Sequence, residues 1–319
     1  MSIITLFIIF LISILFTYFF KKNSKNFDLP NKRSSHTVPV PTSGGVTFCT
    51  ISFLYIIYDI SLNSLSNKNI IFLFCLPLSL VGYIDDQINL KRKYRFLSQF
   101  FVVASLISIF LFSKEDYFLN SINLPQLFIP IIFFVLLFFG IGLINLINFM
   151  DGMDGLVSSC LALTFLYIGL TQNNLTLIIT FSLLGFLVFN WSPASIFMGD
   201  TGSTFLGGIL LASILQSKDF LEFFNLLFIN LPIIADSTSC LILRLYKRQN
   251  IFKPHKLHLY QRLNQNGWSH SKVSSLYIFA SALMLFSITL GNIISTLIFS
   301  FVIIIGGLTI NKKFALKFE

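Results

Sequence analysis

The segment NLINFMDGMDGL, residues 145–156, places two carboxylates at the end of a long apolar run. Asp151 and Asp154 lie three positions apart, a spacing that puts two side chains on one face of a helix. Each is followed by a glycine, which weakens a helix but lets the backbone approach a bulky anion closely. Asn145 and Asn148 repeat the spacing just before them. Taken alone, such an aspartate is more typical of a helix end than of a ligand site, so its interpretation depends on what lies beside it.

Further carboxylates follow other apolar runs. Asp85 and Asp86 close one run in GYIDDQINL, Asp200 follows another in FMGDTGS, and Asp236 lies in the last turns of a later one. An aspartate at a helix C-terminus faces the negative end of the helix dipole, so a cation should offset its charge. Mg²⁺ is usually held by one or two carboxylates together with substrate phosphates. The set therefore favours a divalent cation, Mg²⁺ in particular.

Two polar segments supply positive charge. The first, KRSSHTVPVPTSGGV (32–46), contains His36 and a Gly-Gly turn. The second, residues 244–270, carries among its basic side chains and histidines Lys253, His255, His258 and Arg262. Imidazoles near pH 7 can form hydrogen bonds with phosphate. A metal site built on His255 and His258 is not expected, because no third nitrogen or sulfur ligand is near them in the sequence. Together with the carboxylates, these segments indicate chemistry on phosphate at a membrane surface.

The elements that must position these groups are apolar helices. Of 319 residues, 55% are hydrophobic and 11% are charged, against roughly 25% charged residues in soluble domains. Lipid offers the backbone no hydrogen-bond partner, so helices are the natural spanning structure. We expect an all-α, polytopic integral membrane helix bundle with about eleven transmembrane helices, or about ten if one short run is re-entrant. The predicted spans lie near 2–20, 44–62, 69–84, 97–113, 126–147, 156–171, 174–190, 203–217, 221–241, 273–290 and 292–311.

The distribution of basic residues predicts the orientation. With the N-terminus outside and the C-terminus cytoplasmic, all but Lys68, Lys114 and Lys218 of the 22 Lys and Arg lie in cytoplasmic segments. This asymmetry follows the positive-inside rule and places the aspartates named above on the cytoplasmic side. The formal net charge of +9 therefore reflects topology and anionic headgroups, and no nucleic acid partner is expected. The first span is expected to be retained, because its positive charges follow the apolar run.

The remaining features predict one domain without disulfide bonds. The four cysteines, Cys49, Cys75, Cys160 and Cys240, fall within apolar runs and form no closely spaced pair. They are expected to be small core residues rather than disulfide partners or zinc ligands. No internal repeat or low-complexity segment divides the chain. Residues 1–319 are therefore expected to form a single integral membrane domain, with the motifs between about residues 32 and 270.

Five motifs, in order, resemble those of a known family. SSHTVPVPTSGG, GYIDDQINL, NLINFMDGMDGL, NWSPASIFMGDTGS and PHKLHLYQRL are similar to motifs of the polyprenyl-phosphate N-acetylhexosamine-1-phosphate transferases. These bacterial membrane enzymes begin O-antigen, teichoic acid and related glycans. The chain departs from many relatives at Thr42 and Ser43, where they have an arginine. The cell-wall branch, which transfers phospho-N-acetylmuramoyl-pentapeptide, has three consecutive histidines where this chain has His255, His258 and Tyr260, closer to the O-antigen branch.

The resemblance implies a reaction and its partners. Polyprenyl (undecaprenyl) phosphate would attack the β-phosphorus of a UDP-N-acetylhexosamine and release UMP, as the first membrane step of O-antigen or another surface glycan. The implied cofactor is Mg²⁺, with Mn²⁺ as the alternative ion. The implied location is the bacterial inner membrane with a cytoplasmic active site, and a homodimer is left open. The alternatives are the phospho-N-acetylmuramoyl-pentapeptide transferase of peptidoglycan synthesis and, from a different class, a membrane transporter.

The resemblance also implies residue roles. Asp200 would ligate the metal, with Asp151 as the candidate second ligand. Asp85 and Asp86 would lie beside the reacting phosphates, one of them acting as a base, while Asp151 and Asp154 would position nucleotide or metal. An aspartyl covalent intermediate is the alternative to direct transfer. The expected substrate-binding residues are His36, Asn145, Asn148, Lys253, His255, His258 and Arg262.

Overall fold

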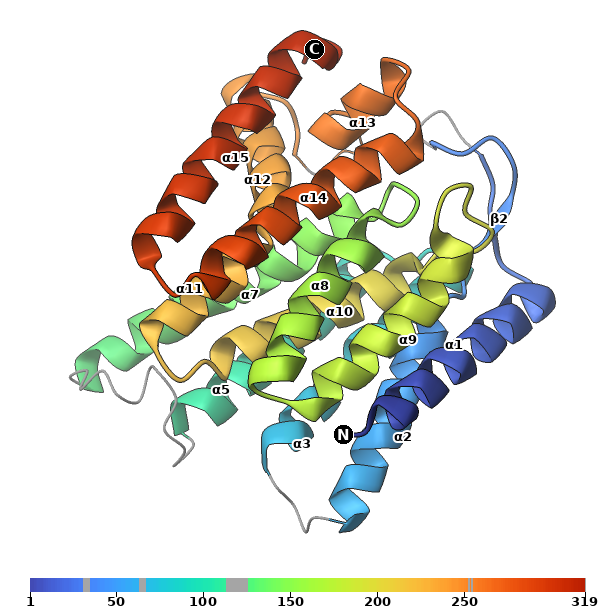
Figure 1. Ribbon diagram of the computed structural model, residues 1–319, viewed down its shortest axis with the longest axis vertical. Coiled ribbons are helices and arrows are strands. Elements are labelled where there is room, and N and C mark those ends of the chain that lie inside the picture. The colour runs from blue at the N-terminus through green and yellow to red at the C-terminus, as the bar shows by residue number, and fades with distance from the viewer. Residues whose placement is uncertain (31–34, 63–66, 113–125, 252, 254, 319) are drawn as a thin grey trace.

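The computed structural model describes residues 1–30, 35–62, 67–112, 126–251, 253 and 255–318, and its fold is all-α as predicted (Figure 1). The one sheet among these residues is the antiparallel pair β1 (Phe27–Asp28) and β2 (Val40–Pro41). The helices are α1 (Ile3–Asn23), α2 (Gly45–Leu62), α3 (Asn67–Leu73), α4 (Leu76–Ile88), α5 (Arg92–Phe112), η1 (Gln126–Phe128), α7 (Ile129–Met150), α8 (Leu156–Thr171), α9 (Asn174–Asn190), α10 (Gly199–Leu215), α11 (Phe220–Ile229), α12 (Leu231–Tyr246), α13 (Leu259–Gln265), α14 (His270–Thr289) and α15 (Ile293–Phe314).

The predicted spans coincide with these helices, but several of the helices are too short to cross a membrane in full. Six helices are long and apolar enough to cross a membrane, and α11 with α12 makes a seventh if the pair, bent by 74°, is one span. Helices α2, α8, α9 and α10 are apolar but shorter. The chain is therefore a multi-pass membrane protein by length and composition, while the number eleven stays a prediction.

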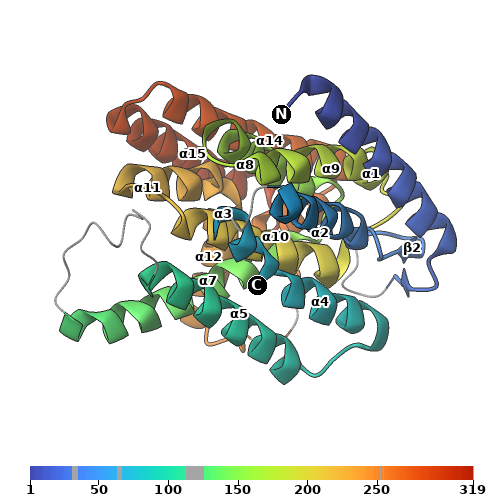
Figure 2. The ribbon, with the colours of Figure 1, turned by 90° about the horizontal axis from the view of Figure 1, so that it is seen from below.

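Helix α10 is the centre of the bundle, as Figure 2 shows. Every side chain from Thr201 to Leu215 is buried, and the helix packs against α2, α4 and α7. Close approach depends on glycine at the helix crossings. A Cβ on Gly82 of α4 would lie 2.5 Å from the carbonyl oxygen of Asp200, so only glycine lets the two backbones approach this closely.

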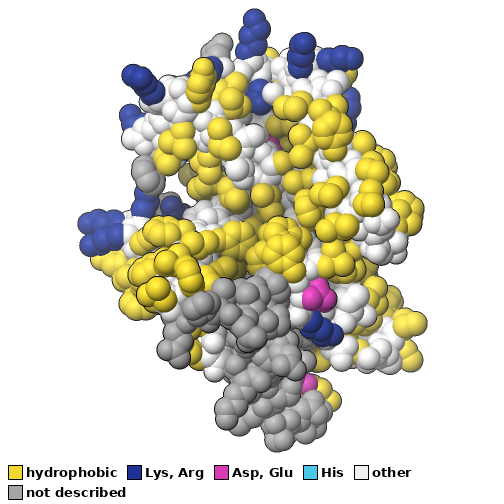
Figure 3. All heavy atoms as spheres, turned by 90° about the vertical axis from the view of Figure 1, so that its left-hand side faces the viewer, with side chains coloured by type: hydrophobic (Ala, Val, Ile, Leu, Met, Phe, Trp, Pro, Cys, Tyr) yellow, Lys and Arg dark blue, Asp and Glu magenta, His cyan; other side chains and the backbone are white. Residues whose placement is uncertain are grey.

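In Figure 1, β2, the connection from α7 to α8, the connection from α9 to α10 and α13 lie toward the same end of the bundle. Hydrogen bonds join α4 to α10, α7 to α10, and α12 to α13 at this end. Lys and Arg side chains gather at the same end of the face drawn in Figure 3, above a band of hydrophobic side chains. The assignment of this end to the cytoplasmic side stays a prediction of the positive-inside rule.

Candidate active site

The C-terminus of α4 and the first turn of α5 form one wall of the site. Asn89 ends α4 in the left-handed conformation, with a φ of 49°, and the chain turns directly into α5. The Oδ1 atom of Asp85 accepts a hydrogen bond from the backbone N–H of Leu90 at 2.6 Å. Its Oδ2 atom accepts one from Nη1 of Arg95 at 2.9 Å. Asp85 is therefore fixed by the helix–turn–helix connection and paired with a cation.

Asp86 points from α4 to the start of α10. Its Oδ1 atom accepts a hydrogen bond from the backbone N–H of Asp200 at 2.8 Å. Its Oδ2 atom accepts from the backbone N–H of Thr201 at 3.1 Å and from the Thr201 hydroxyl at 2.6 Å. The carboxylate thus satisfies N–H groups that a helix N-terminus leaves unpaired. Gly199, with a φ of 69°, leaves room for this contact, because a Cβ there would clash with Oδ2 of Asp86.

Asp200 is the residue at which three helices converge. Its Oδ1 atom accepts a hydrogen bond from Nδ2 of Asn148 at 2.8 Å, and the same amide donates to the Ser203 hydroxyl at 2.8 Å. Its Oδ2 atom accepts from Nη1 of Arg95 at 2.6 Å. Carboxylates from α4 and α10 therefore share one guanidinium, while an amide from α7 completes the arrangement.

The first polar segment docks against the loop that precedes α10. The backbone N–H of Gly44 donates to the carbonyl oxygen of Phe197 at 2.9 Å, and that of Phe197 donates to Pro41 at 2.7 Å. The ring of His36 lies against the ring of Phe197, with centroids 5.1 Å apart. Its Nε2 atom lies 3.3 Å from the carbonyl oxygen of Asp28. His36 therefore belongs to the loop layer that covers the start of α10.

Asp151 directly follows α7 and is half-buried. Its side chain forms no hydrogen bond with any other residue that the structure describes. Burial raises its pKa well above the ordinary value, and the nearby carboxylates of Asp200, Asp86 and Asp154 raise the pKa further. A carboxylate held beside other carboxylates without a donor is a natural oxygen ligand for a divalent cation.

Asp154 has a different environment from Asp151. Its Oδ1 atom lies 3.0 Å from Nδ1 of His270, and its Oδ2 atom accepts from the backbone N–H of Ala194 at 3.1 Å. Burial acts to raise the pKa of Asp154, but the hydrogen bond and charge of His270 outweigh it and lower the pKa. His270 also contacts the carbonyl oxygen of Ser35 at 3.2 Å. Asp154 thus joins the segment before α8 to the loop before α10 and to the start of α14.

Two predicted substrate-binding residues are used elsewhere. The amide of Asn145 pairs with Gln99 across α7 and α5, at 2.8 and 3.3 Å. Arg262 is buried and donates from Nε to the carbonyl oxygen of Leu257 and from Nη1 to that of Leu316. The structure therefore places Asn145 in a helix contact and uses Arg262 to hold the C-terminal segment against α13.

The loop before α13 carries the remaining predicted residues. Lys253 is exposed. His255 is half-buried, and burial, the neighbouring His258 and Arg244 lower its pKa to about 4, so it is neutral near pH 7. His258 is buried, with its ring 5.6 Å from that of Tyr260. The ring of His258 lies beside that of Phe149, with centroids 6.5 Å apart, and His255 carries no positive charge near pH 7.

Sequence reasoning missed several residues that build the site. Arg95 was grouped with the topology-determining charges, although its place one turn into the next helix after Asp85 is a usable signal. Asp236 was counted among the cytoplasmic carboxylates without a role. It accepts hydrogen bonds from the backbone N–H groups of Leu259 and Tyr260 and from the hydroxyl of Tyr277. No sequence pattern pairs residues so far apart.

The fold and site define a multi-pass membrane protein with a carboxylate cluster at one end. The family model of glycosyl transferase family 4 matches residues 69–218. Similar curated proteins include phospho-N-acetylmuramoyl-pentapeptide-transferases of three staphylococci. That of Staphylococcus carnosus is 30% identical over 265 residues, that of Staphylococcus saprophyticus 34% over 266, and that of Staphylococcus haemolyticus 32% over 265, each match covering 74% of this chain and 80% of the relative. The chain belongs to glycosyl transferase family 4.

The names of these relatives favour one of the two predicted enzyme reactions over the other. All three are named for transfer of phospho-N-acetylmuramoyl-pentapeptide, the reaction that the sequence motifs held as the alternative. The family expectation is confirmed, whereas its assignment to the O-antigen branch is not supported by these relatives.

Proposed function

We propose that the protein transfers a phospho-N-acetylhexosaminyl unit from a UDP-linked donor to polyprenyl phosphate and releases UMP on the cytoplasmic side of a bacterial membrane. By its relatives, the first candidate donor is UDP-N-acetylmuramoyl-pentapeptide. One observation carries the proposal: the ends of α4, α7 and α10 bring Asp85, Asp151 and Asp200 together with Asn148 and Arg95. Phosphoryl transfer depends mainly on positioning and charge neutralisation, and this set of side chains can do both.

The donor set fits Mg²⁺. Asp200 and Asp151 would hold the ion, since both offer carboxylate oxygens and Asp151 lacks a protein donor among the described residues. When bound, Mg²⁺ would neutralise charge on the donor diphosphate. Arg95 can contact the same phosphate oxygens, and Asn148 orients Asp200. Asp85 is the candidate base, although a phosphate monoester is already largely ionised at neutral pH and needs little help.

An apolar groove of about 400 Å³ supplies a place for the lipid acceptor. It runs along α7 and across the bend between α11 and α12, lined by residues that include Phe138, Leu143, Leu146, Phe228 and Leu231. A polyprenyl chain lying along α7 would bring its phosphate toward Asn148 and Asp151, which follow in the next turn. The lining of the groove is apolar, and its last residue on α7, Leu146, lies two positions before Asn148.

A second donor class is favoured by the loop before α13. The sequence PHKLHLYQRL lacks the three consecutive histidines of the cell-wall branch. Tyr260 instead donates a hydrogen bond to the carbonyl oxygen of Phe149 at 3.1 Å, next to Asp151. This difference beside the site favours an unsubstituted UDP-N-acetylhexosamine as the second candidate donor.

One assay tests the reaction and separates the donors. Purified protein would be incubated with undecaprenyl phosphate, Mg²⁺ and either UDP-N-acetylmuramoyl-pentapeptide or a panel of UDP-N-acetylhexosamines. UMP and lipid-linked sugar would then be measured. We expect one of the two donor classes to give UMP release. That release should require undecaprenyl phosphate and should stop when a chelator removes Mg²⁺. Asp200→Asn should lower turnover by about 100-fold or more, whereas Asp59→Asn, near the opposite end of α2, should not. Lack of UMP release with every donor would refute the proposal.

A further inference from the structure

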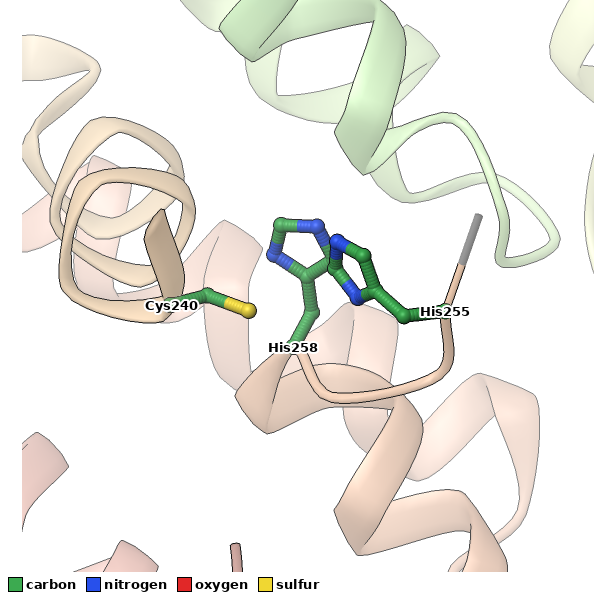
Figure 4. Close-up of side chains that lie close together, drawn as sticks. All are labelled: Cys240, His255 and His258. Carbon is green, nitrogen blue, oxygen red and sulfur yellow. The ribbon is translucent and has the colours of Figure 1, made fainter. Parts of the chain in front are cut away.

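Three side chains that the proposed transfer reaction leaves without a shared role lie together between α12 and the segment that precedes α13. Cys240 comes from α12, and His255 and His258 come from the loop that precedes α13. One donor atom from each lies within 4.8 Å of the other two. Figure 4 shows the sulfur of Cys240 and the two imidazole rings gathered in the same space. The sulfur ligand that is absent from the local sequence is therefore supplied by a helix.

The helix holds the loop on both sides of Cys240. Asp236, Cys240 and Arg244 lie four residues apart along one face of α12 and are 5%, 2% and 4% exposed. Arg244 donates to two backbone carbonyl groups of the loop, at 2.5 and 3.2 Å. Asp236 accepts from two backbone N–H groups in the first turn of α13, at 2.7 and 3.2 Å. Because both ends are fixed, the histidines are held opposite the thiol.

The rings of the two histidines are also restrained. Nδ1 of His255 lies 3.3 Å from the backbone N–H of Leu257, which leaves its Nε2 atom for a ligand. His258 is only 3% exposed, and its buried Nδ1 atom has no hydrogen-bond partner among the described residues. The closest acid is Asp236, with Oδ1 at 3.8 Å. A carboxylate beside a histidine is a common outer partner in metal sites.

We propose that Cys240, His255 and His258 bind a Zn²⁺-class ion at a site distinct from the carboxylate cluster. One sulfur and two nitrogen donors suit Zn²⁺, whereas Mg²⁺ prefers oxygen. Binding replaces the S–H bond of Cys240 with a sulfur–metal bond, and the thiol proton goes to solvent. The histidines contribute nitrogen lone pairs, and water completes the coordination on the half-exposed side of His255.

Occupancy of the site would fix the loop to α12 and engage both histidines. The ion would therefore withdraw His255 and His258 from any contact with substrate. We expect Zn²⁺ to inhibit a wild-type protein that is saturated with Mg²⁺, and Cys240→Ser to relieve that inhibition.

Binding is tested without reference to the reaction. The untagged full-length protein would be freed of metal in detergent, given excess Mg²⁺ to fill the carboxylate cluster and titrated with Co²⁺, then examined by equilibrium dialysis with Zn²⁺ in the same Mg²⁺ buffer. One ion per chain and a thiolate-to-cobalt charge-transfer band are expected. Cys240→Ser should abolish the band and weaken Zn²⁺ binding at least tenfold. Cys160→Ser, which changes another fully buried cysteine on α8, should retain both.

A second variant guards against misfolding of the cysteine mutant. His255→Gln changes a half-buried ring and should weaken Zn²⁺ binding while leaving the metal-free Tm unchanged. Absence of a thiolate band in the wild type, or equal Zn²⁺ affinity in the wild type and His255→Gln, would overturn the proposal. Failure of UMP release would leave these binding measurements unaffected, so the two proposals fail separately.

Discussion

Nη1 of Arg95 lies 2.6 Å from Oδ2 of Asp200, and the same nitrogen lies 2.9 Å from Oδ2 of Asp85. One guanidinium therefore joins carboxylates from two helices that are more than a hundred residues apart. Arg95 therefore neutralises the same oxygen of Asp200 that the proposed metal ion could use. Arg95 pairs with both carboxylates and, under the metal role proposed for Asp200, would compete with the ion.

This competition predicts the effect of Arg95→Gln. Removing the guanidinium should strengthen Mg²⁺ binding, because two carboxylates without a cation attract the ion more strongly. We expect the Mg²⁺ concentration for half-maximal UMP release to fall by about 3- to 10-fold, a modest factor because the side chain is partly exposed. The value of kcat should also fall, since a phosphate contact is lost. Lys93→Gln, on the same helix, is the matched control, and an unchanged or higher Mg²⁺ requirement would contradict the prediction.

Asp86 is expected to contribute to stability as well as activity. Asp86→Asn replaces one accepting oxygen with a donor that faces N–H groups, so hydrogen bonds to the start of α10 are lost. A lost charge-assisted hydrogen bond costs about 1–3 kcal/mol, and we expect Tm in detergent to fall by about 5 °C. Asp200→Asn should lower kcat and should lower Tm by less than Asp86→Asn, because Arg95 keeps its pairing with Asp85 and repulsion among the carboxylates falls. If Asp86→Asn retains the wild-type Tm, its carboxylate does not anchor α10.

Asp151 is expected to lower the stability of the folded protein near neutral pH. Its pKa in the folded chain is raised above the ordinary 3.8, so the folded state binds its proton more tightly than the unfolded state does. Stability is therefore lost as pH rises from about 4 through the folded pKa. Asp151→Asn should have a higher Tm than wild type at about pH 7.5, and the two should converge near pH 4.

The effect of Mg²⁺ on Tm provides a second test of the role of Asp151. The ion should raise the Tm of the wild type more than that of Asp151→Asn, because it relieves the repulsion among the carboxylates. Turnover of the variant should be reduced by about 100-fold. Equal Mg²⁺-dependent shifts in Tm would exclude Asp151 as a ligand.

Gly152 and Tyr260 should form a coupled pair. A Cβ at position 152 would clash with the Tyr260 hydroxyl, whereas the next atom of that ring would lie at 3.3 Å. Gly152→Ala is therefore expected to destabilise the protein by about 1–3 kcal/mol, the usual cost of overpacking. Tyr260→Phe removes the clashing oxygen and should recover most of this loss. Additive effects in the double mutant, measured by thermal unfolding, would show that the two residues do not interact.

Local patterns predicted the helices well, because apolar run length is visible in the sequence. The predicted spans near 156–171 and 174–190 match α8 and α9 in both position and extent. Two helix breaks were not predicted. The apolar stretch near 69–84 divides into α3 and α4, and the stretch near 221–241 bends by 74° between α11 and α12. Pro77 and Pro232, each in the first turn of the second helix, are local signals for both breaks.

The site was predicted by residue type more than by partner. Carboxylates at helix ends identified Asp85, Asp86, Asp151 and Asp200, which the structure brings to one place. Asn145 and Arg262 looked equally suitable, yet each is engaged by a neighbour that only the tertiary fold supplies. Cys240 is the converse case, since nothing near it in sequence pairs it with a histidine. Pairings across long sequence separations follow from packing, which local spacing does not encode.

The buried position of α10 has a consequence for the synthesis of the protein. Asp86 and Asp200 are separated by 114 positions, so α4 and α7 are made well before the helix that joins them. A chain that stops before residue 199 carries Asp85, Asp86 and Asp151 but lacks Asp200 and the donors in the first turn of α10 that hold Asp86. Arrival of α10 is therefore the step in membrane insertion that brings the carboxylates together, and shorter translation products should be inert toward phosphorylated lipids.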